Sequence, residues 1–334
     1  LQVIGSLVDL VWTGAVDNVW NYSTNNWSDG SATFFGSGDS ARIQTAAAIS
    51  IQAEGIQANG VTVANPSGTA SLTDGPLTAA TLTKSAAGTL ELSNATTATA
   101  IAVQAGTLAI TGAGTLTGST LANNAVVAYV SSADQTLAAS LSGSGSLSQS
   151  GTGRLTLAGG GDYSGSLSVA AGSVLEIAGA TPLGPDGSYA GPIGVEGELV
   201  LSGTGGQVLA GAVSGFGTLT KAGSGSVTLA GVNSGFAGTV AVTAGTLVLG
   251  SNTALGGTDL GTTVAASSVL DLGGRSIGAE PLTLTGNGIS TSGALINSDT
   301  ATAASWAGPV TLGSATTGVG GAGNITISGS VSGN

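Results

Sequence analysis

Few residues of this chain could take part in covalent or acid–base chemistry. The 334 residues include no His and no Cys, so a Ser-His-Asp triad, a thiol nucleophile and the usual zinc ligand sets are all excluded. Lys84 and Lys221 would allow a Ser-Lys dyad, but both occupy one position of an internal repeat whose middle copy has Gln149 there. We therefore interpret both lysines as structural residues of the surface.

Paired carboxylates are the second feature of the sequence that would allow catalysis. Glu196 and Glu198 lie two residues apart, which would place them on one face of a strand, and Asp186 is close in sequence. Asp259 and Asp271 are isolated. A polysaccharide-active β-helix enzyme would require a basic residue beside its acids, and no Lys or Arg accompanies Glu196, Glu198 and Asp186. The sequence thus predicts no catalytic residues and no enzyme, with such a polysaccharide-active enzyme as the alternative.

Calcium is the one metal that the sequence leaves open. The run Gly-Gly-Gly-Asp at residues 159–162 faintly resembles Gly-Asp calcium-binding repeats, whose oxygen ligands would suit that ion. The run occurs once and lacks a nine-residue period. We predict no cofactor and no metal site, with calcium as a weakly supported alternative.

The overall composition indicates an almost wholly β protein. Charged residues make up 7% of the chain, against about 25% in ordinary globular proteins. Glycine occurs 59 times, which disfavours helices, and Val, Leu and Ile recur at regular spacing. Thr, Val and Ile favour strands. The net charge of −12 with only five scattered cations argues against a nucleic-acid partner. No apolar run approaches the ~18 residues of a membrane-spanning helix.

Internal repetition organises these strands. Three segments aligned on Leu82, Leu147 and Leu219 share the pattern L-[TS]-[KQ]-x-[GA]-x-G-x-[LV]-x-L. Each is followed by a second alternating run and then by an A-G-[TS] corner with a further run. Alternation gives a strand with one buried side, and Gly-x-Gly supplies a tight corner. Because one short strand cannot bury its apolar row alone, we expect stacked coils of about 20–25 residues, roughly 14–16 in all.

The repeat resembles the passenger-associated transport repeat, also called the autotransporter-associated β-strand repeat. The residues that carry the resemblance are the G-T-L-T-K-A-G-S-G-S-V-T-L string at 217–229, its continuation at 238–249 and the weaker copies from Leu82 and Leu147. The resemblance implies a right-handed parallel β-helix and an autotransporter passenger that is displayed on, or released from, the outer membrane. It also implies a translocating β-barrel, and we find no series of ~10-residue amphipathic strands for one in this chain.

The two ends of the chain differ in composition. Residues 1–45 are aromatic-rich and contain Trp12, Trp20, Trp27 and Tyr22, which we interpret as a cap over the exposed end of the solenoid. A carbohydrate-binding aromatic platform is the alternative. Residues 46–334 are predicted to form the β-helix of a single elongated domain, with repeats near 81–112, 145–179 and 217–250. The last residues resemble the segment that leads into the repeat near 217–250, so we expect a truncated C-terminus.

These features predict a non-catalytic structural or adhesive protein of the bacterial surface or the extracellular space. Its expected partners are copies of itself, in an oligomer or fibre packed end to end or laterally, and a host or matrix surface. Three alternatives to this function remain: the polysaccharide-active enzyme, a glycan-binding module and an ice-binding module.

Overall fold

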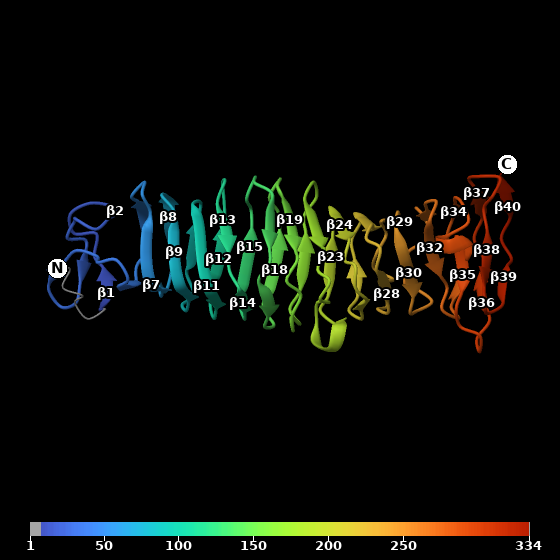
Figure 1. Cartoon of the computed structure of the whole chain (residues 1–334), viewed down its shortest axis with the longest axis horizontal. Coiled ribbons are helices and arrows are strands. Elements are labelled where there is room, and N and C mark those ends of the chain that lie inside the picture. The colour runs from blue at the N-terminus through green and yellow to red at the C-terminus, as the bar shows by residue number, and fades with distance from the viewer. Residues whose placement is uncertain (1–7, 334) are drawn as a thin grey trace. The chain divides into compact units, whose positions relative to one another are not determined.

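The structure is a computed structural model that describes residues 8–333, and it consists almost entirely of β-strands (Figure 1). The chain divides into a first unit that ends at Leu155 and a second unit that begins at Thr156. The helical segments among the described residues are two three-residue 3-10 turns, η1 (Pro185–Gly187) and η2 (Ile289–Thr291). Within residues 8–333 no helix is long and apolar enough to cross a membrane.

Most strands of the first unit form two sheets, in each of which successive coils contribute neighbouring strands. The first sheet has the order β17-β14-β11-β9-β7-β5-β1-β3-β4, and β13 pairs with β11. Its strands are β1 (Asp9–Trp12), β3 (Trp27–Ser28), β4 (Ala32–Thr33), β5 (Ser40–Ile43), β7 (Ile56–Val63), β9 (Leu77–Lys84), β11 (Ala95–Val103), β13 (Thr115–Thr117), β14 (Thr120–Asn123) and β17 (Ser140–Ser142). Within the first unit, the second sheet comprises β2 (Val19–Trp20), β6 (Ala47–Ile51), β8 (Thr69–Asp74), β10 (Thr89–Leu92), β12 (Thr107–Ile110), β15 (Val126–Tyr129) and β18 (Ser146–Gln149). The remaining strand, β16 (Gln135–Leu137), belongs to a third sheet.

Parallel register stacks like residues on like residues. Leu82 of β9 pairs with Ile101 of β11, which pairs in turn with Leu121 of β14. These three side chains are buried, while the residues on either side of each face outward. The interior is therefore a continuous apolar column that no single coil could form, because each short strand has only one apolar row.

The second unit repeats this construction with different strands. β19 (Arg154–Leu157) spans the division between the units. The strands that follow are β20 (Leu167–Val169), β21 (Val174–Ile177), β22 (Ser188–Tyr189), β23 (Ile193–Val195), β24 (Glu198–Leu201), β25 (Gln207–Leu209), β26 (Val213–Ser214), β27 (Thr218–Lys221), β28 (Ser226–Leu229), β29 (Thr239–Val242), β30 (Gly245–Leu249), β31 (Thr262–Val264), β32 (Ser268–Asp271), β33 (Ser276–Ile277), β34 (Leu282–Leu284), β35 (Leu295–Asn297), β36 (Ala304–Trp306), β37 (Val310–Leu312), β38 (Val319–Gly321), β39 (Ile325–Ile327) and β40 (Val331–Gly333). Leu199, Leu219 and Val240 form one of its buried columns.

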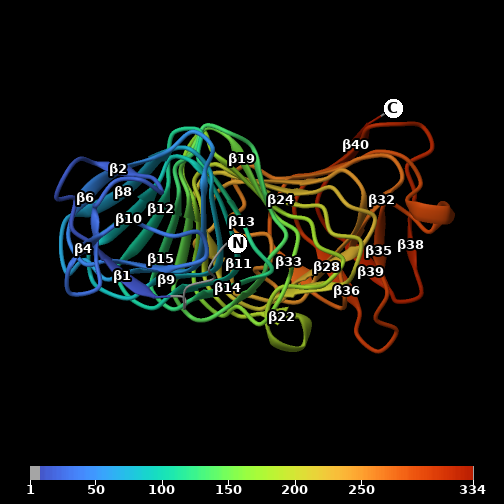
Figure 2. The same ribbon diagram turned by 60° about the vertical axis from the view of Figure 1, so that its left-hand side comes forward.

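The turned view shows the coils of each unit as successive loops around an interior (Figure 2). Counted over both units, the turns number about 15. The predicted all-β parallel solenoid is thus confirmed. The segment at 180–197, which its three prolines predict to be a projecting loop, is only partly a loop, because it contains η1 and the paired strands β22 and β23.

Candidate functional site

The side chains that the repeat pattern places at one shared position lie inside the solenoid, not on its surface. Lys84, Gln149 and Lys221 each end a strand, and each is at most 2% exposed. The prediction that the two lysines are surface residues is therefore wrong. The reason is the two-residue period of a strand: each of these residues follows a buried Leu by two positions and so points to the same side.

Each buried polar head is held by backbone carbonyls of the corner that follows it. The Lys84 Nζ donates to the Ala86 carbonyl and the Lys221 Nζ to the Gly223 carbonyl. In the middle copy the Gln149 amide donates to the Gly151 carbonyl at 3.3 Å. Carbonyls at a tight corner cannot pair with a strand, so an interior donor satisfies them at the place where water is excluded.

The corner glycine of the next coil completes this arrangement. Gly245 has a φ of +68°, and a Cβ at that position would lie 2.3 Å from the Gly223 carbonyl oxygen and 2.7 Å from the Lys221 Nζ. The same Nζ donates to the Ala244 carbonyl at 3.1 Å. The lysine thus joins two successive corners, and the space around its ammonium leaves room only for glycine.

Burial changes the proton affinity of these lysines. Loss of hydration lowers the pKa of Lys84 from its ordinary value and lowers the pKa of Lys221 to about 8. Among the described residues, no serine hydroxyl hydrogen-bonds either Nζ. The arrangement therefore provides a structural cross-link and not the Ser-Lys dyad that the composition left open.

Comparison with protein families finds a match to three segments of the chain. The passenger-associated-transport-repeat model matches residues 82–110, 147–177 and 219–249, and each match begins at the anchoring Leu of one copy. The chain carries passenger-associated transport repeats. Together with the parallel solenoid, these repeats fit an autotransporter passenger domain, and they imply a secreted or cell-surface protein. Searches of curated proteins and of solved structures found no match.

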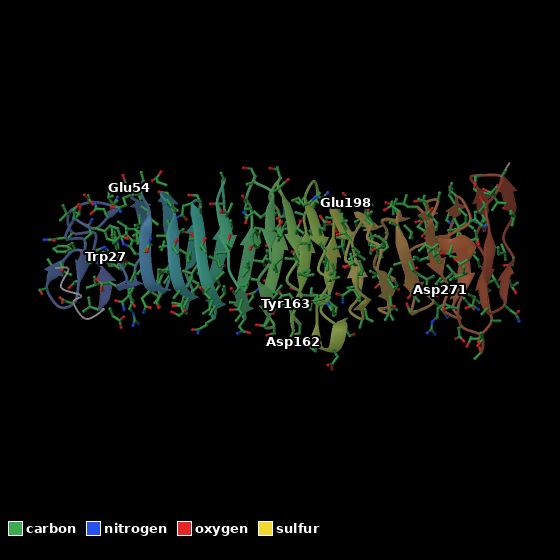
Figure 3. The ribbon with its side chains drawn as sticks, viewed as in Figure 1. Trp27, Glu54, Asp162, Tyr163, Glu198 and Asp271 are labelled. Carbon is green, nitrogen blue, oxygen red and sulfur yellow. The ribbon has the colours of Figure 1, made fainter. Side chains whose placement is uncertain are left out.

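The aromatic residues that precede the first transport repeat are packed against one another. Trp20 and Trp27 have no exposed surface, and their ring centroids lie 4.8 Å apart. Trp12 meets Trp27 edge to face at 5.1 Å, and Phe35 contacts both Trp20 and Trp27 at about 5 Å. The Tyr22 hydroxyl accepts a hydrogen bond from the backbone N–H of Gln57 at 2.8 Å. Figure 3 shows Trp27 among the first strands of the chain.

The backbone around this cluster reverses the parallel pairing. Here β1 pairs with β3, and β3 with β4, in antiparallel register, with Trp12 opposite Trp27. The Asn26 side chain fixes the connecting loop: its oxygen accepts from the Val16 and Asp17 amides, and its amide donates to Asp17 and Val19. A stacking ring face for a sugar is absent at Trp20 and Trp27, because both are fully buried. The packed rings are compatible with the predicted cap, which stays a prediction.

The acidic residues that suggested catalysis are not brought together. Gly197 lies at a corner between Glu196, which is exposed after β23, and Glu198, which begins β24. The expectation that the two acids share one strand face is wrong, because the chain turns between them. The Glu198 carboxylate accepts from the Thr220 hydroxyl at 2.9 Å, and Asp186 lies in η1.

The other acids are likewise dispersed. Asp259 and Asp162 are exposed, whereas Asp271 is buried and accepts from the Gly273 and Ser298 amides at 3.0 Å each. Figure 3 shows Asp162, Glu198 and Asp271 at separate places on the second unit. Within residues 8–333, no three Asp or Glu side chains gather as ligands of a metal ion.

The outer face of the first sheet bears on the ice-binding alternative. Its in-register rows mix residue types: one reads Ser40, Gly60, Thr81, Ala100, Thr120 and Ser140. The neighbouring row reads Arg42, Thr62, Thr83, Ala102, Ala122 and Ser142. A regular threonine ladder does not form on this face.

Proposed function

We propose that this chain is a non-catalytic structural passenger segment that is displayed outside a bacterial cell and contacts other surfaces through its outer faces. The observation that carries the proposal is where the transport repeats place their polar side chains. Lys84, Gln149 and Lys221 are used to fix corners from the inside, so the characteristic residues of the repeat support a rigid stack and contribute no reactive group to the surface.

The outer faces support a role in contact with surfaces. Short, uncharged side chains dominate them, as in the rows of Ser, Thr and Ala on the first sheet. Because each strand is hydrogen-bonded to a neighbouring strand on both sides, these rows have a constant spacing. A regular row of this kind can make many weak contacts at once with a matrix or with another copy of the chain. Lateral contact is the form of self-association that we propose, because β1, the first strand of the parallel stack, is paired on its other side with the antiparallel strand β3 and offers no free edge.

Binding to coated surfaces, together with a degradation assay, tests this function. Purified chain would be applied to plates coated with matrix proteins or bacterial surface polysaccharides, and the same polysaccharides in solution would be checked for released products. We expect retention on at least one coating without product formation. Product release would contradict the non-catalytic role, and absence of retention on every coating would contradict the adhesive one.

A further inference from the structure

A polar groove of about 190 Å³ lies on the outer face of the first sheet, across the strands β1, β5, β7 and β9. Parallel register places its residues: Asp9, Ser40, Gly60 and Thr81 form one row over the four strands, and Arg42 lies beside Thr62 in the next row. The groove is lined by Asp9, Ser40, Ala41, Arg42, Asn59, Gly60, Thr62 and Thr81. The inward residues of these strands are buried, so the lining is held on a fixed framework.

The groove exists because Gly60 interrupts a row of side chains. A Cβ at Gly60 would lie 2.8 Å from the Thr81 hydroxyl oxygen and 3.8 Å from the Ser40 hydroxyl oxygen. Both hydroxyls therefore flank the floor that the missing side chain leaves open. Asn59, just outside the row, donates to the Ser40 hydroxyl at 3.4 Å. The floor thus presents several hydroxyl and amide groups within a small area.

Arg42 gives the groove its one positive charge. Its side chain is exposed, and among residues 8–333 no hydrogen bond or ion pair is formed by its guanidinium. The other four cations of the chain are engaged differently. Lys84 and Lys221 are buried in corners, Arg154 has an interaction partner, and Arg275 lies near enough to Asp299 to lower the pKa of that carboxyl. The guanidinium of Arg42 is therefore available to pair with an anionic group of a ligand in the groove.

We propose that this groove binds one saccharide unit that carries a carboxylate. The planar guanidinium of Arg42 would hold the carboxylate through two parallel hydrogen bonds. Ser40, Thr81 and Asn59 would pair with ring hydroxyls. Asp9, at the end of the row, would accept a hydrogen bond from a further hydroxyl of the sugar. A groove of this volume accommodates a single sugar ring rather than an extended chain.

A saccharide with a carboxylate would be one target of the surface contact proposed above. Only this biological setting rests on the proposed function, because binding in the groove can be measured by itself. Titration of the purified chain with glucuronate, followed by ligand-observed NMR and calorimetry, tests it. Glucose, which has the ring without the carboxylate, and acetate, which has the carboxylate without the ring, serve as controls. Saturable binding of glucuronate that exceeds both controls supports the proposal, while equal binding of all three, or none, overturns it.

Two variants locate the site. Arg42→Gln should weaken glucuronate binding by about tenfold or more, because it removes the charge-assisted pair. Gly60→Ser should also weaken it, because the new side chain fills the floor, and circular dichroism would confirm that the variant folds.

Arg275→Gln is the matched control, since it removes an Arg elsewhere on the chain and should leave affinity unchanged. Unchanged affinity in Arg42→Gln, or equal loss in Arg275→Gln, would overturn the assignment. Surface retention could fail without affecting these titrations, so the two proposals can be judged separately.

Discussion

The Lys221 Nζ donates a hydrogen bond to the Ala244 carbonyl, 3.1 Å away, in the coil that follows its own. The same ammonium also holds the Gly223 carbonyl of its own corner. A charged group has therefore been taken out of water to join two corners, and within residues 8–333 its hydrogen bonds go to backbone carbonyls rather than to a carboxylate. Burial lowers its pKa. At this position of the transport repeat, an apolar side chain of similar length would leave the corner carbonyls without hydrogen-bond donors, whereas the lysine supplies them.

Substitution of this lysine should distinguish the hydrogen bonds from the apolar packing. Lys221→Met keeps the length of the side chain but leaves buried carbonyls unpaired, so we expect a loss of about 1–3 kcal/mol in the free energy of unfolding. Lys221→Gln should cost less, because Gln149 occupies the equivalent place and keeps a donor. Urea unfolding followed by circular dichroism measures both. A Met variant as stable as the native chain would show that the cross-link does not contribute.

The lowered pKa of Lys221 also predicts a dependence of stability on pH. The folded state releases this proton near pH 8, whereas the unfolded chain keeps it up to about pH 10.5. The unfolded state therefore binds more protons between these values, and stability should rise with pH across this window. Comparison of the native chain with Lys221→Gln at each pH isolates the contribution. A stability difference between the two that stays constant from pH 7.5 to 10.5 would contradict the assignment.

Glu280 should have the opposite dependence on pH. It is 2% exposed, its carboxylate accepts from the Thr262 hydroxyl, and burial raises its pKa to about 7 from 4.5. Because the folded state holds this proton longer than the unfolded chain, stability should fall as the pH rises from 4.5 to 7 and then level off. Glu280→Gln should therefore be the more stable form at pH 8, by on the order of 3 kcal/mol. Thermal unfolding of both chains at pH 4 and pH 8 checks this: the advantage should be present only at pH 8.

Removal of one ring from the aromatic cluster should destabilise the end of the first unit. Trp27→Ala deletes a fully buried ring that contacts Trp12, Trp20 and Phe35, so we expect a cost of about 3–5 kcal/mol. Phe34→Ala is the matched control, because Phe34 is 57% exposed and should cost little. Limited proteolysis would show whether the loss is local. Equal effects of the two substitutions would contradict the interpretation of the cluster as a packed cap.

The solenoid could be predicted from the sequence because its signals are local. Alternation identifies strands, and the A-G-[TS] corner of the repeat identifies a glycine such as Gly245, whose positive φ was required. Alternation with Leu82 also predicts that the Lys84 side chain points into the interior. Lysine is usually exposed, however, and that general preference leads to the wrong prediction of a surface residue. The separation of Glu196 from Glu198 depended on recognising Gly197 as a corner.

The groove at Arg42 could not be predicted, because its lining is set by register. Asp9, Ser40, Gly60 and Thr81 come from four coils, and they meet only because Asp9 pairs with Ser40, Ser40 with Gly60, and Gly60 with Thr81. A shift of one residue in any pairing would turn a lining residue toward the core. The coil lengths that fix this register vary along the chain, and no repeat pattern covers residues 9–81.

Detection of the chain on intact cells is the most direct test of the account. Bacteria that produce the protein would be probed with antibodies raised against the purified chain, before and after lysis, with a periplasmic protein as the control for leakage. We predict that the chain is labelled on intact cells, or recovered from the medium, while the control becomes accessible only on lysis. Labelling of the chain only after lysis, with none in the medium, would contradict its role as a displayed passenger.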